Sequence, residues 1–174
     1  MAEASEAHSV ALPSFQFRSV REATTAVHQA ATTAGAAPLH PLPFNRYDTS
    51  GDWGNYAVFS DDGGATWQRG LDVPRNPAAI QGNECQVVER ADGSVMLDAR
   101  RSAGTRNRKT AISTDGGRSW SPLAEQPGLP SPACMASVLR FTDPADGYRS
   151  RLFYAGPNST SSRVHGVLRI SYDE

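Results

Sequence analysis

An eight-residue motif that recurs at a nearly constant interval restricts the possible folds of this chain more than any other feature. The segment SDDGGATW at positions 60–67 returns 53 residues later as STDGGRSW at positions 113–120. A third copy begins with SYD at positions 171–173, 58 residues after the second. Such a period indicates an architecture of successive similar units, because each repeat folds as one unit that packs on its neighbours.

The residue types that recur are those that a tight turn needs. The Asp carboxylate can accept hydrogen bonds from the backbone amides of its own turn. Glycine supplies the positive φ of a hairpin turn, and Trp covers the turn with a large apolar ring. Each copy is therefore expected to close a turn between two strands.

Short apolar runs between the motifs predict strands. From position 41 onward, runs rich in Val, Ile, Leu, Phe and Tyr alternate with Asp-Gly, Gly-Gly, Pro and Asn, which is typical of all-β proteins. The expected strands cover residues 56–60, 84–90, 94–101, 110–113, 136–141, 152–155 and 167–171. A period of about 50 residues is the size of a four-stranded β-propeller blade. The sequence thus predicts about three blades of a closed ring, since an open stack leaves exposed edges.

Composition divides the chain into two segments near residue 40. Residues 1–40 contain eleven Ala and few large apolar residues. Within them, Ser19 and Glu22 fit a capping box that opens a short helix, and Gly35 fits its end. We expect an Ala-rich helical or irregular segment over residues 1–40 and a partial propeller over residues 41–174.

The charge balance excludes several kinds of partner. Seventeen basic and eighteen acidic residues give a net charge of −1, so no overall field attracts nucleic acid or an anionic membrane. No apolar run approaches the roughly 20 residues of a membrane span, and no signal peptide is visible in residues 1–11. Sixteen of the seventeen bases are Arg. This excess reflects either coding bias or guanidiniums that grip a planar carboxylate.

No metal or cofactor is indicated. Cys85 and Cys134 are too few for a disulfide framework and lack the spacing of a zinc site. Both are expected to be small buried core residues. The four histidines are scattered along the chain.

The recurring motif resembles the Asp-box of the exo-α-sialidases, which are six-bladed β-propellers. The first copy fits the pattern Ser-x-Asp-x-Gly-x-Thr-Trp completely, with Ser60, Asp62, Gly64, Thr66 and Trp67. The second copy departs only at Ser119, and its other matching residues are Ser113, Asp115, Gly117 and Trp120. Because Asp-boxes also occur in proteins that are not enzymes, this resemblance alone implies a fold rather than an activity.

A second resemblance concerns the segment between the two motifs. NECQVVE at 83–89, with DAR at 98–100, is similar to a sialidase segment that carries a glutamate and an arginine of the site. The glutamate activates a tyrosine nucleophile and the arginine clamps the substrate carboxylate, roles that the resemblance places on Glu84 and Arg100. LFY at 152–154 and GPN at 156–158 resemble a segment that ends in another clamp arginine, here Arg163. The implied substrate is a sialylated glycan or free sialic acid. Residues 43–47 are a candidate strand end that lines the pocket.

The strand register can be examined without reference to the family. A two-residue turn at Asp92-Gly93 would put Glu84 and Arg100 on opposite faces of the hairpin. A three-residue loop with Gly93 in the left-handed region places Glu84 opposite Arg100. The same register pairs Cys85 with Ala99 and Val87 with Leu97, and it gathers Glu84, Gln86, Asp98 and Arg100 on the other face. We expect this register because it yields one apolar face and one polar face.

The resemblance also implies a mechanism. A sialoside carries its carboxylate on the anomeric carbon, so a carboxylate nucleophile would approach an anion, and sialidases use tyrosine with retention. A phenol has a pKa of about 10, so a neighbouring glutamate, here Glu84, must accept its proton. The family's first clamp-arginine motif and its acid/base aspartate are missing from the sequence. None of the tyrosines stands in the context of the nucleophile; these are Tyr47, Tyr56, Tyr148, Tyr154 and Tyr172.

We therefore expect an incomplete exo-α-sialidase with little or no hydrolase activity of its own. Two other interpretations stay open at the level of sequence. One is a non-catalytic Asp-box propeller that binds glycans or proteins, and the other is a non-functional gene remnant.

Overall fold

The computed structural model describes residues 41–47, 49, 52–76, 81–103 and 106–174. Ten β-strands form three antiparallel sheets, and the helical structure of these residues is a single 3₁₀ turn, Pro144–Asp146. The all-β prediction is thus confirmed for the described part of the chain. The helix expected after Ser19 lies outside the described residues.

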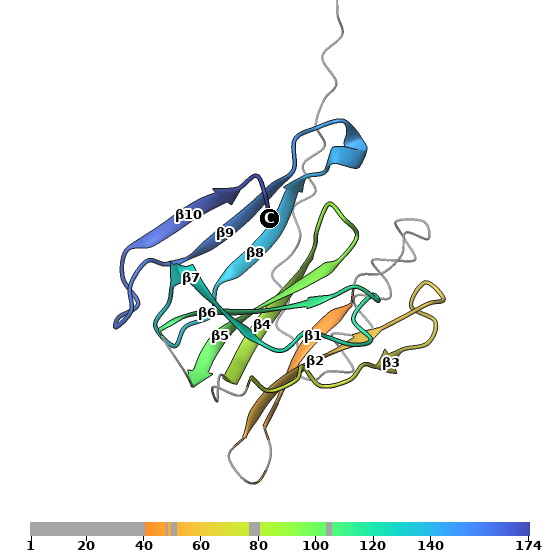
Figure 1. Cartoon of the computed structure of the whole chain (residues 1–174), viewed down its shortest axis with the longest axis horizontal. Coiled ribbons are helices and arrows are strands. Elements are labelled where there is room, and N and C mark those ends of the chain that lie inside the picture. Colours follow the sequence, from red (N-terminus) through yellow and green to blue (C-terminus); the bar gives the residue numbers. More distant parts are fainter. Residues whose placement is uncertain (1–40, 48, 50–51, 77–80, 104–105) are drawn as a thin grey trace, which may run out of the picture.

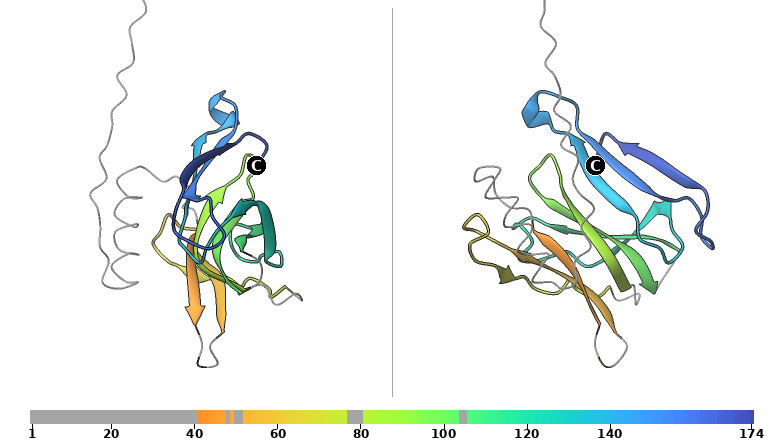
Figure 2. Two further views of the ribbon diagram at one scale, coloured as in Figure 1. Left: turned by 90° about the vertical axis from the view of Figure 1, so that its left-hand side faces the viewer. Right: turned by 180° about the vertical axis from the view of Figure 1, so that it is seen from behind.

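The sheets follow one another in chain order, as Figures 1 and 2 show. The first contains β1 (Leu42–Tyr47), β2 (Trp53–Phe59) and β3 (Gln68–Arg69). The second contains β4 (Gln81–Glu89), β5 (Val95–Ala103), β6 (Asn107–Ser113) and β7 (Ala124–Pro130). The third contains β8 (Ser137–Thr142), β9 (Arg151–Pro157) and β10 (Gly166–Ser171). Strands adjacent in sequence are adjacent in each sheet, as in propeller blades.

Each expected strand overlaps an observed one, and β1 contains the candidate strand end at residues 43–47, but β3 and β7 lie outside the prediction. β3 has only two residues. β7 has the sequence AEQPGLP, and its Pro and Gly residues are depleted in strands. Its pairing with β6, where Lys109 lies opposite Glu125, gives β7 its place at the outer edge of the second sheet.

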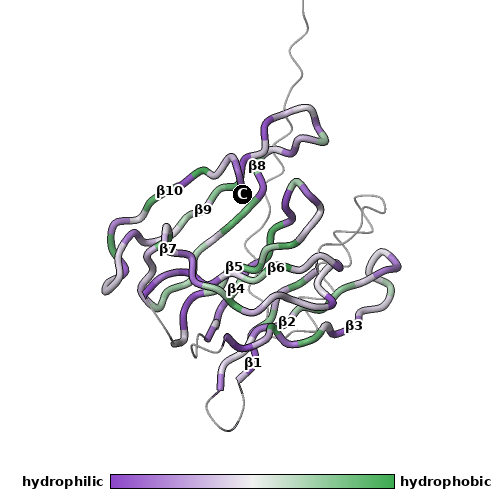
Figure 3. Tube along the Cα trace, viewed as in Figure 1, coloured by the Kyte–Doolittle hydropathy of each residue, from purple (hydrophilic) through white to green (hydrophobic). Residues whose placement is uncertain are grey.

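Two hydrophobic clusters join the sheets. The larger lies between the first and second sheets and contains Ala57, Val73, Val95, Leu97, Ala99, Ala111, Trp120 and Leu123. The smaller lies between the second and third sheets and contains Val88, Val138 and Leu152, with Met96 packed against it. Figure 3 shows hydrophobic residues gathered on β4, β5 and β8, around this second junction. Because β4 contacts β1, β2 and β8, it is the central strand of the described structure.

The β4–β5 hairpin has the predicted register from Cys85 to Glu89, and a β-bulge shifts the register between Gly82 and Cys85. Cys85 pairs with Ala99 and Val87 with Leu97, while Gly93 has a φ of +80°. The three-residue loop is therefore confirmed. The apolar face of the hairpin packs toward the first sheet, because Leu97 and Ala99 belong to the larger cluster.

Both complete Asp-boxes close their turns with the expected hydrogen bonds. Asp62 accepts from the backbone N–H of Thr66 at 2.8 Å and from its hydroxyl at 2.6 Å. Asp115 accepts from the same two groups of Ser119 at 2.9 and 2.5 Å. The two glycines of each turn have φ values between 69° and 91°. These contacts confirm the predicted turn chemistry.

The expectation that both cysteines are small buried core residues is confirmed only in part, for Cys85. Cys85 and Cys134 are each half-buried. Cys85 packs against the larger cluster, and burial raises the pKa of its thiol to about 12, so it stays protonated at neutral pH. Cys134 lies in the connection between β7 and β8, where its thiol donates to the carbonyl of Met135.

Two findings concern possible surroundings of the chain. Across the described ranges, the structure contains no helix long and apolar enough to cross a membrane. Within the same residues, no group of three His, Cys, Asp or Glu side chains is arranged to hold a metal ion.

Candidate carboxylate-binding site

Glu84 and Arg100 form an ion pair on the polar face of the β4–β5 hairpin. The Arg100 Nε lies 3.1 Å from the Glu84 Oε2, and 49% of the Glu84 side chain is exposed. The start of β4 and the end of β5 meet at the end of the sheet away from the Asp-boxes, which follow β2 and β6. The hairpin therefore brings two of the predicted site residues together on an accessible surface, through a side-chain ion pair beside the β-bulge.

Arg163 joins this pair from the third sheet. Its Nη2 donates to the carbonyl oxygen of Ala133 at 3.4 Å, and the Arg100 Nη1 donates to the same oxygen at 3.2 Å. Arg100 is on β5, whereas Arg163 is in the loop between β9 and β10. Two guanidiniums that are 63 positions apart in the sequence thus converge on one acceptor atom.

A buried ion pair that the sequence did not reveal lies beneath this site. Arg108 on β6 donates to both carboxylate oxygens of Asp98 on β5, with distances of 2.6 to 3.1 Å. The two side chains are 0% and 2% exposed. Burial raises the pKa of the Asp98 carboxyl, and the hydrogen bonds from Arg108 act in the opposite direction. The predicted register placed Asp98 on the polar face of the hairpin. A carboxylate that becomes buried requires a partner, so this placement was the available signal in the sequence for the ion pair.

Arg108 also connects this pair to the site. Its Nη1 donates to the carbonyl of Cys134 at 2.9 Å, next to the Ala133 carbonyl that Arg100 and Arg163 contact. Three arginines therefore hold the backbone of residues 133 and 134. This backbone segment links the second sheet to the third, so it fixes how Arg100 and Arg163 stand relative to each other.

Asparagines support the strand that carries Glu84. The Asn83 Oδ1 accepts from the backbone N–H of Glu84 at 2.8 Å and from the Asn45 side chain at 3.4 Å. Asn55 donates to the Asn83 carbonyl at 2.7 Å. A side chain at Gly82 would collide with Asn55. Residues 43–47 form most of β1, and Asn45 is the residue through which they reach the site.

Tyr154 is a buried phenol close to the Asp98–Arg108 pair. Its side chain points to the second sheet and lies over Gly156, and its hydroxyl has no hydrogen-bond partner among the described residues. Burial raises its pKa. In the described part of the chain, Glu84 pairs with Arg100 and contacts no tyrosine hydroxyl, so Tyr154 is not placed as its nucleophile partner.

Comparisons with known proteins identify relatives of this arrangement. Residues 16–173 match the BNR repeat-like domain. The chain is 40% identical over 121 residues to a sialidase of Micromonospora viridifaciens, covering 68% of this chain and 18% of that protein. It is 32% identical over 119 residues to a sialidase of Bacteroides fragilis, covering 67% of this chain and 21% of that protein. The chain thus spans about a fifth of the length of these relatives.

Solved structures show the same fold. The intramolecular trans-sialidase of Ruminococcus gnavus, solved in complex with oseltamivir carboxylate, matches with a TM-score of 0.54 and 25% identity over 72% of this chain and 28% of that one. The NanB sialidase of Streptococcus pneumoniae matches with a TM-score of 0.56 and 26% identity over 75% of this chain and 19% of that one. The three sheets are thus part of a sialidase-type β-propeller. With the BNR repeat-like domain matching residues 16–173, the chain belongs to the BNR repeat-like family, in a region that it shares with sialidases.

Proposed function

We propose that this chain carries the carboxylate-binding part of an exo-α-sialidase, a glycoside hydrolase that removes terminal sialic acid from glycans. Arg100 and Arg163 bind the substrate carboxylate, and Glu84 is the glutamate that accepts a proton from the tyrosine nucleophile of the complete site. The observation that carries the proposal is the convergence of Arg100 and Arg163 on the Ala133 carbonyl oxygen. The sialidase relatives support the choice of substrate.

The arrangement favours a carboxylate over the acceptor that it now holds. The Ala133 oxygen is a neutral acceptor shared by two guanidiniums. A substrate carboxylate has a negative charge and two oxygens, so it can form stronger, charge-assisted bonds with both arginines. We expect the carboxylate to replace the Ala133 carbonyl between them.

Glu84 acts on Arg100 as well as on the expected nucleophile. Its carboxylate neutralises one of the two guanidiniums through the 3.1 Å ion pair, while Arg163 keeps its positive charge toward the substrate. The pair also fixes the Arg100 side chain, which lowers the entropy cost of binding. Because half of the Glu84 side chain is exposed, it can reach a group that approaches from solvent.

Binding of N-acetylneuraminic acid to the 174-residue chain, followed by NMR, tests the proposal. Each charge-assisted bond contributes roughly 1.5–3 kcal/mol, so Arg100→Gln and Arg163→Gln should each weaken binding about tenfold or more. Arg149→Gln is the matched control, because Arg149 is an exposed arginine that precedes β9, at the other end of that strand from Arg163.

Two outcomes would contradict the proposal. One is equal affinity in all three variants, and the other is no binding by a chain whose unfolding transition is intact.

A fluorogenic sialoside measured in parallel should show little or no turnover, since we assign no nucleophile to this chain.

A further inference from the structure

A β-bulge in β4 lies at Asn83 and Glu84, which together are opposite the single residue Arg100 of β5. The pairs on either side of the bulge are Gly82–Arg101 and Cys85–Ala99. A bulge interrupts the ladder of hydrogen bonds and re-aims the side chains next to it. The backbone groups that it frees need other partners where they are buried, and Asn83 is only 2% exposed. The direction of the Glu84 side chain therefore depends on what satisfies these groups.

Two asparagine side chains supply such partners. The Asn83 Oδ1 accepts from the backbone N–H of Glu84 at 2.8 Å, so the donor is satisfied within the bulge itself. The Asn83 carbonyl accepts from the Asn55 Nδ2 at 2.7 Å. Asn55 is on β2 in the first sheet and is 1% exposed. Both backbone groups of the bulge are thus held by side-chain amides.

Asn55 contacts the chain on both sides of Glu84. A side chain at Gly82 would collide with the Asn55 Oδ1, so the glycine lets β2 and β4 approach closely. Burial raises the pKa of the Cys85 thiol to about 12, while a hydrogen bond with the Asn55 side chain acts in the opposite direction. With its bond to the Asn83 carbonyl, this one buried amide contacts residues 82, 83 and 85. Glu84 itself is half exposed, so its position follows from theirs.

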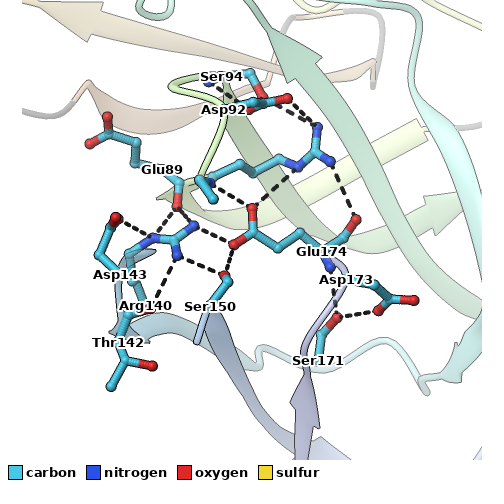
Figure 4. Close-up of polar contacts among 12 residues, drawn as sticks. Glu89, Asp92, Ser94, Arg140, Thr142, Asp143, Ser150, Ser171, Asp173 and Glu174 are labelled. Atoms are coloured by element: carbon cyan, nitrogen blue, oxygen red, sulfur yellow. Dashed lines mark hydrogen bonds and ion pairs between the residues drawn. The ribbon is translucent and has the colours of Figure 1, made fainter. Parts of the chain in front are cut away.

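The loop end of the same hairpin is held by a separate polar network (Figure 4). The Glu174 side chain accepts from the Arg140 Nη2 at 2.8 Å and from the backbone N–H of Ala91 at 2.6 Å. The Arg140 Nη2 also donates to the Glu89 carbonyl at 2.7 Å. These contacts join the loop between β4 and β5 to the third sheet, at the end of the hairpin away from Glu84. The two ends of the hairpin are therefore fixed by different residues and can be loosened one at a time.

We propose that Asn55 and Asn83 are positioning residues that hold the Glu84 carboxylate beside the Arg100 guanidinium. The first sheet carries neither the glutamate nor the two arginines of the site, and it contributes to the site through this buried amide. A Glu84 carboxylate held in one place also holds Arg100 in one place, through the 3.1 Å ion pair. This inference rests on the role proposed above for Glu84, and it names the residues on which that role depends.

The NMR signal of the Arg100 Nε–H tests the proposal without any ligand, and its absence from Arg100→Gln identifies it. In the otherwise unmodified chain, Glu84→Gln should shift this signal, because it removes a carboxylate charge 3.1 Å away. In the background of Asn83→Ala, the same substitution should leave the signal nearly unchanged, because Glu84 no longer lies in one place. Asn83→Asp should restore the response, since a carboxylate also accepts from the Glu84 N–H.

A second variant and two controls separate positioning from general loosening of the fold. Asn55→Leu removes the other amide bond of the bulge and should suppress the Arg100 response in the same way. Asn76→Leu loses an equivalent amide bond, to the Leu123 carbonyl at 2.9 Å. Arg140→Gln loosens the loop end of the hairpin. Both controls should keep the full response.

Hydrogen exchange of the unmodified chain needs no variant. The Glu84 amide proton should exchange slowly with solvent, because it is bonded to the Asn83 side chain. A rapidly exchanging Glu84 amide would overturn the proposal. A full Arg100 response in both Asn83→Ala and Asn55→Leu would also overturn it, as would an equal loss of the response in the two controls.

Binding of N-acetylneuraminic acid separates this inference from the proposed function. Asn83→Ala should weaken binding about two- to tenfold, the cost of ordering one more long side chain, and Asn83→Asp should restore it. Unchanged affinity in Asn83→Ala would overturn the inference. An unmodified chain that shows the Arg100 response but binds no N-acetylneuraminic acid would contradict the proposed function, and it would leave Asn55 and Asn83 as positioning residues of the ion pair.

Discussion

At the scale of single residues, arginines of very different environments build the candidate site. Arg108 is completely buried against Asp98, whereas Arg163 is exposed and Arg100 is half-buried. The length of the hairpin loop and the alternation of apolar residues were enough to predict that Arg100 lies near Glu84. The burial of Arg108 depends on the third sheet that covers it, and no local pattern in the sequence contains that information.

The Asp98–Arg108 pair makes a prediction about stability. Asp98→Ala leaves the Arg108 guanidinium buried without its partner, which costs about 3–5 kcal/mol. Urea denaturation should show this loss, and binding at Arg100 and Arg163 should weaken because Arg108 holds the Cys134 carbonyl. The double variant Asp98→Met with Arg108→Leu should recover most of the stability, since it removes both charges. Wild-type stability in Asp98→Ala would contradict this account of the pair.

At the scale of elements, the Asp-boxes are self-contained turns whose stability depends on an ionised carboxylate. The side-chain and backbone hydrogen bonds from Thr66 lower the pKa of Asp62 to about 2. Burial acts to raise the pKa of Asp115, but the bonds from Ser119 and Ser113 outweigh it and lower the value. A lowered pKa in the folded state adds stability above the unfolded value of 3.8. This contribution is lost as the pH falls through the folded pKa.

Asp62→Asn should therefore lower the melting temperature by a few degrees at pH 7, because the neutral amide accepts weaker bonds from Thr66. The difference from the unmodified chain should shrink as the pH falls from about 4 to about 2. Asp146→Asn is the control, since Asp146 is an exposed aspartate in the 3₁₀ turn, away from the boxes. A difference that stays constant over this pH range would show that the Asp62 charge does not stabilise the turn.

The sequence predicts an element well where local turn chemistry determines it. It predicts a strand poorly where the strand forms only because a neighbouring sheet edge is open for pairing. The boxes and the β4–β5 hairpin follow from residues such as Asp62, Gly93 and Gly117, whose requirements are met within a few positions. β7 has no strand pattern of its own and exists because β6 offers an edge for pairing. The same reason explains why the lone Lys109 is fully buried opposite Glu125, which its sequence context does not indicate.

At the scale of the whole molecule, the proposed carboxylate-binding site depends on how two sheets meet. Glu84 and Arg100 come from the second sheet and Arg163 from the third, and the Ala133–Cys134 backbone joins them. The repeat period predicted the three sheets, but it could not predict that two guanidiniums share one oxygen, because that contact depends on the angle between sheets.

A crystal structure of the chain soaked with N-acetylneuraminic acid tests the central claim most directly. We predict carboxylate oxygens at roughly 2.7–2.9 Å from the guanidiniums of both Arg100 and Arg163, with the Ala133 carbonyl displaced from between them. An Ala133 oxygen that keeps both arginines while the sugar binds elsewhere, or not at all, would contradict the claim.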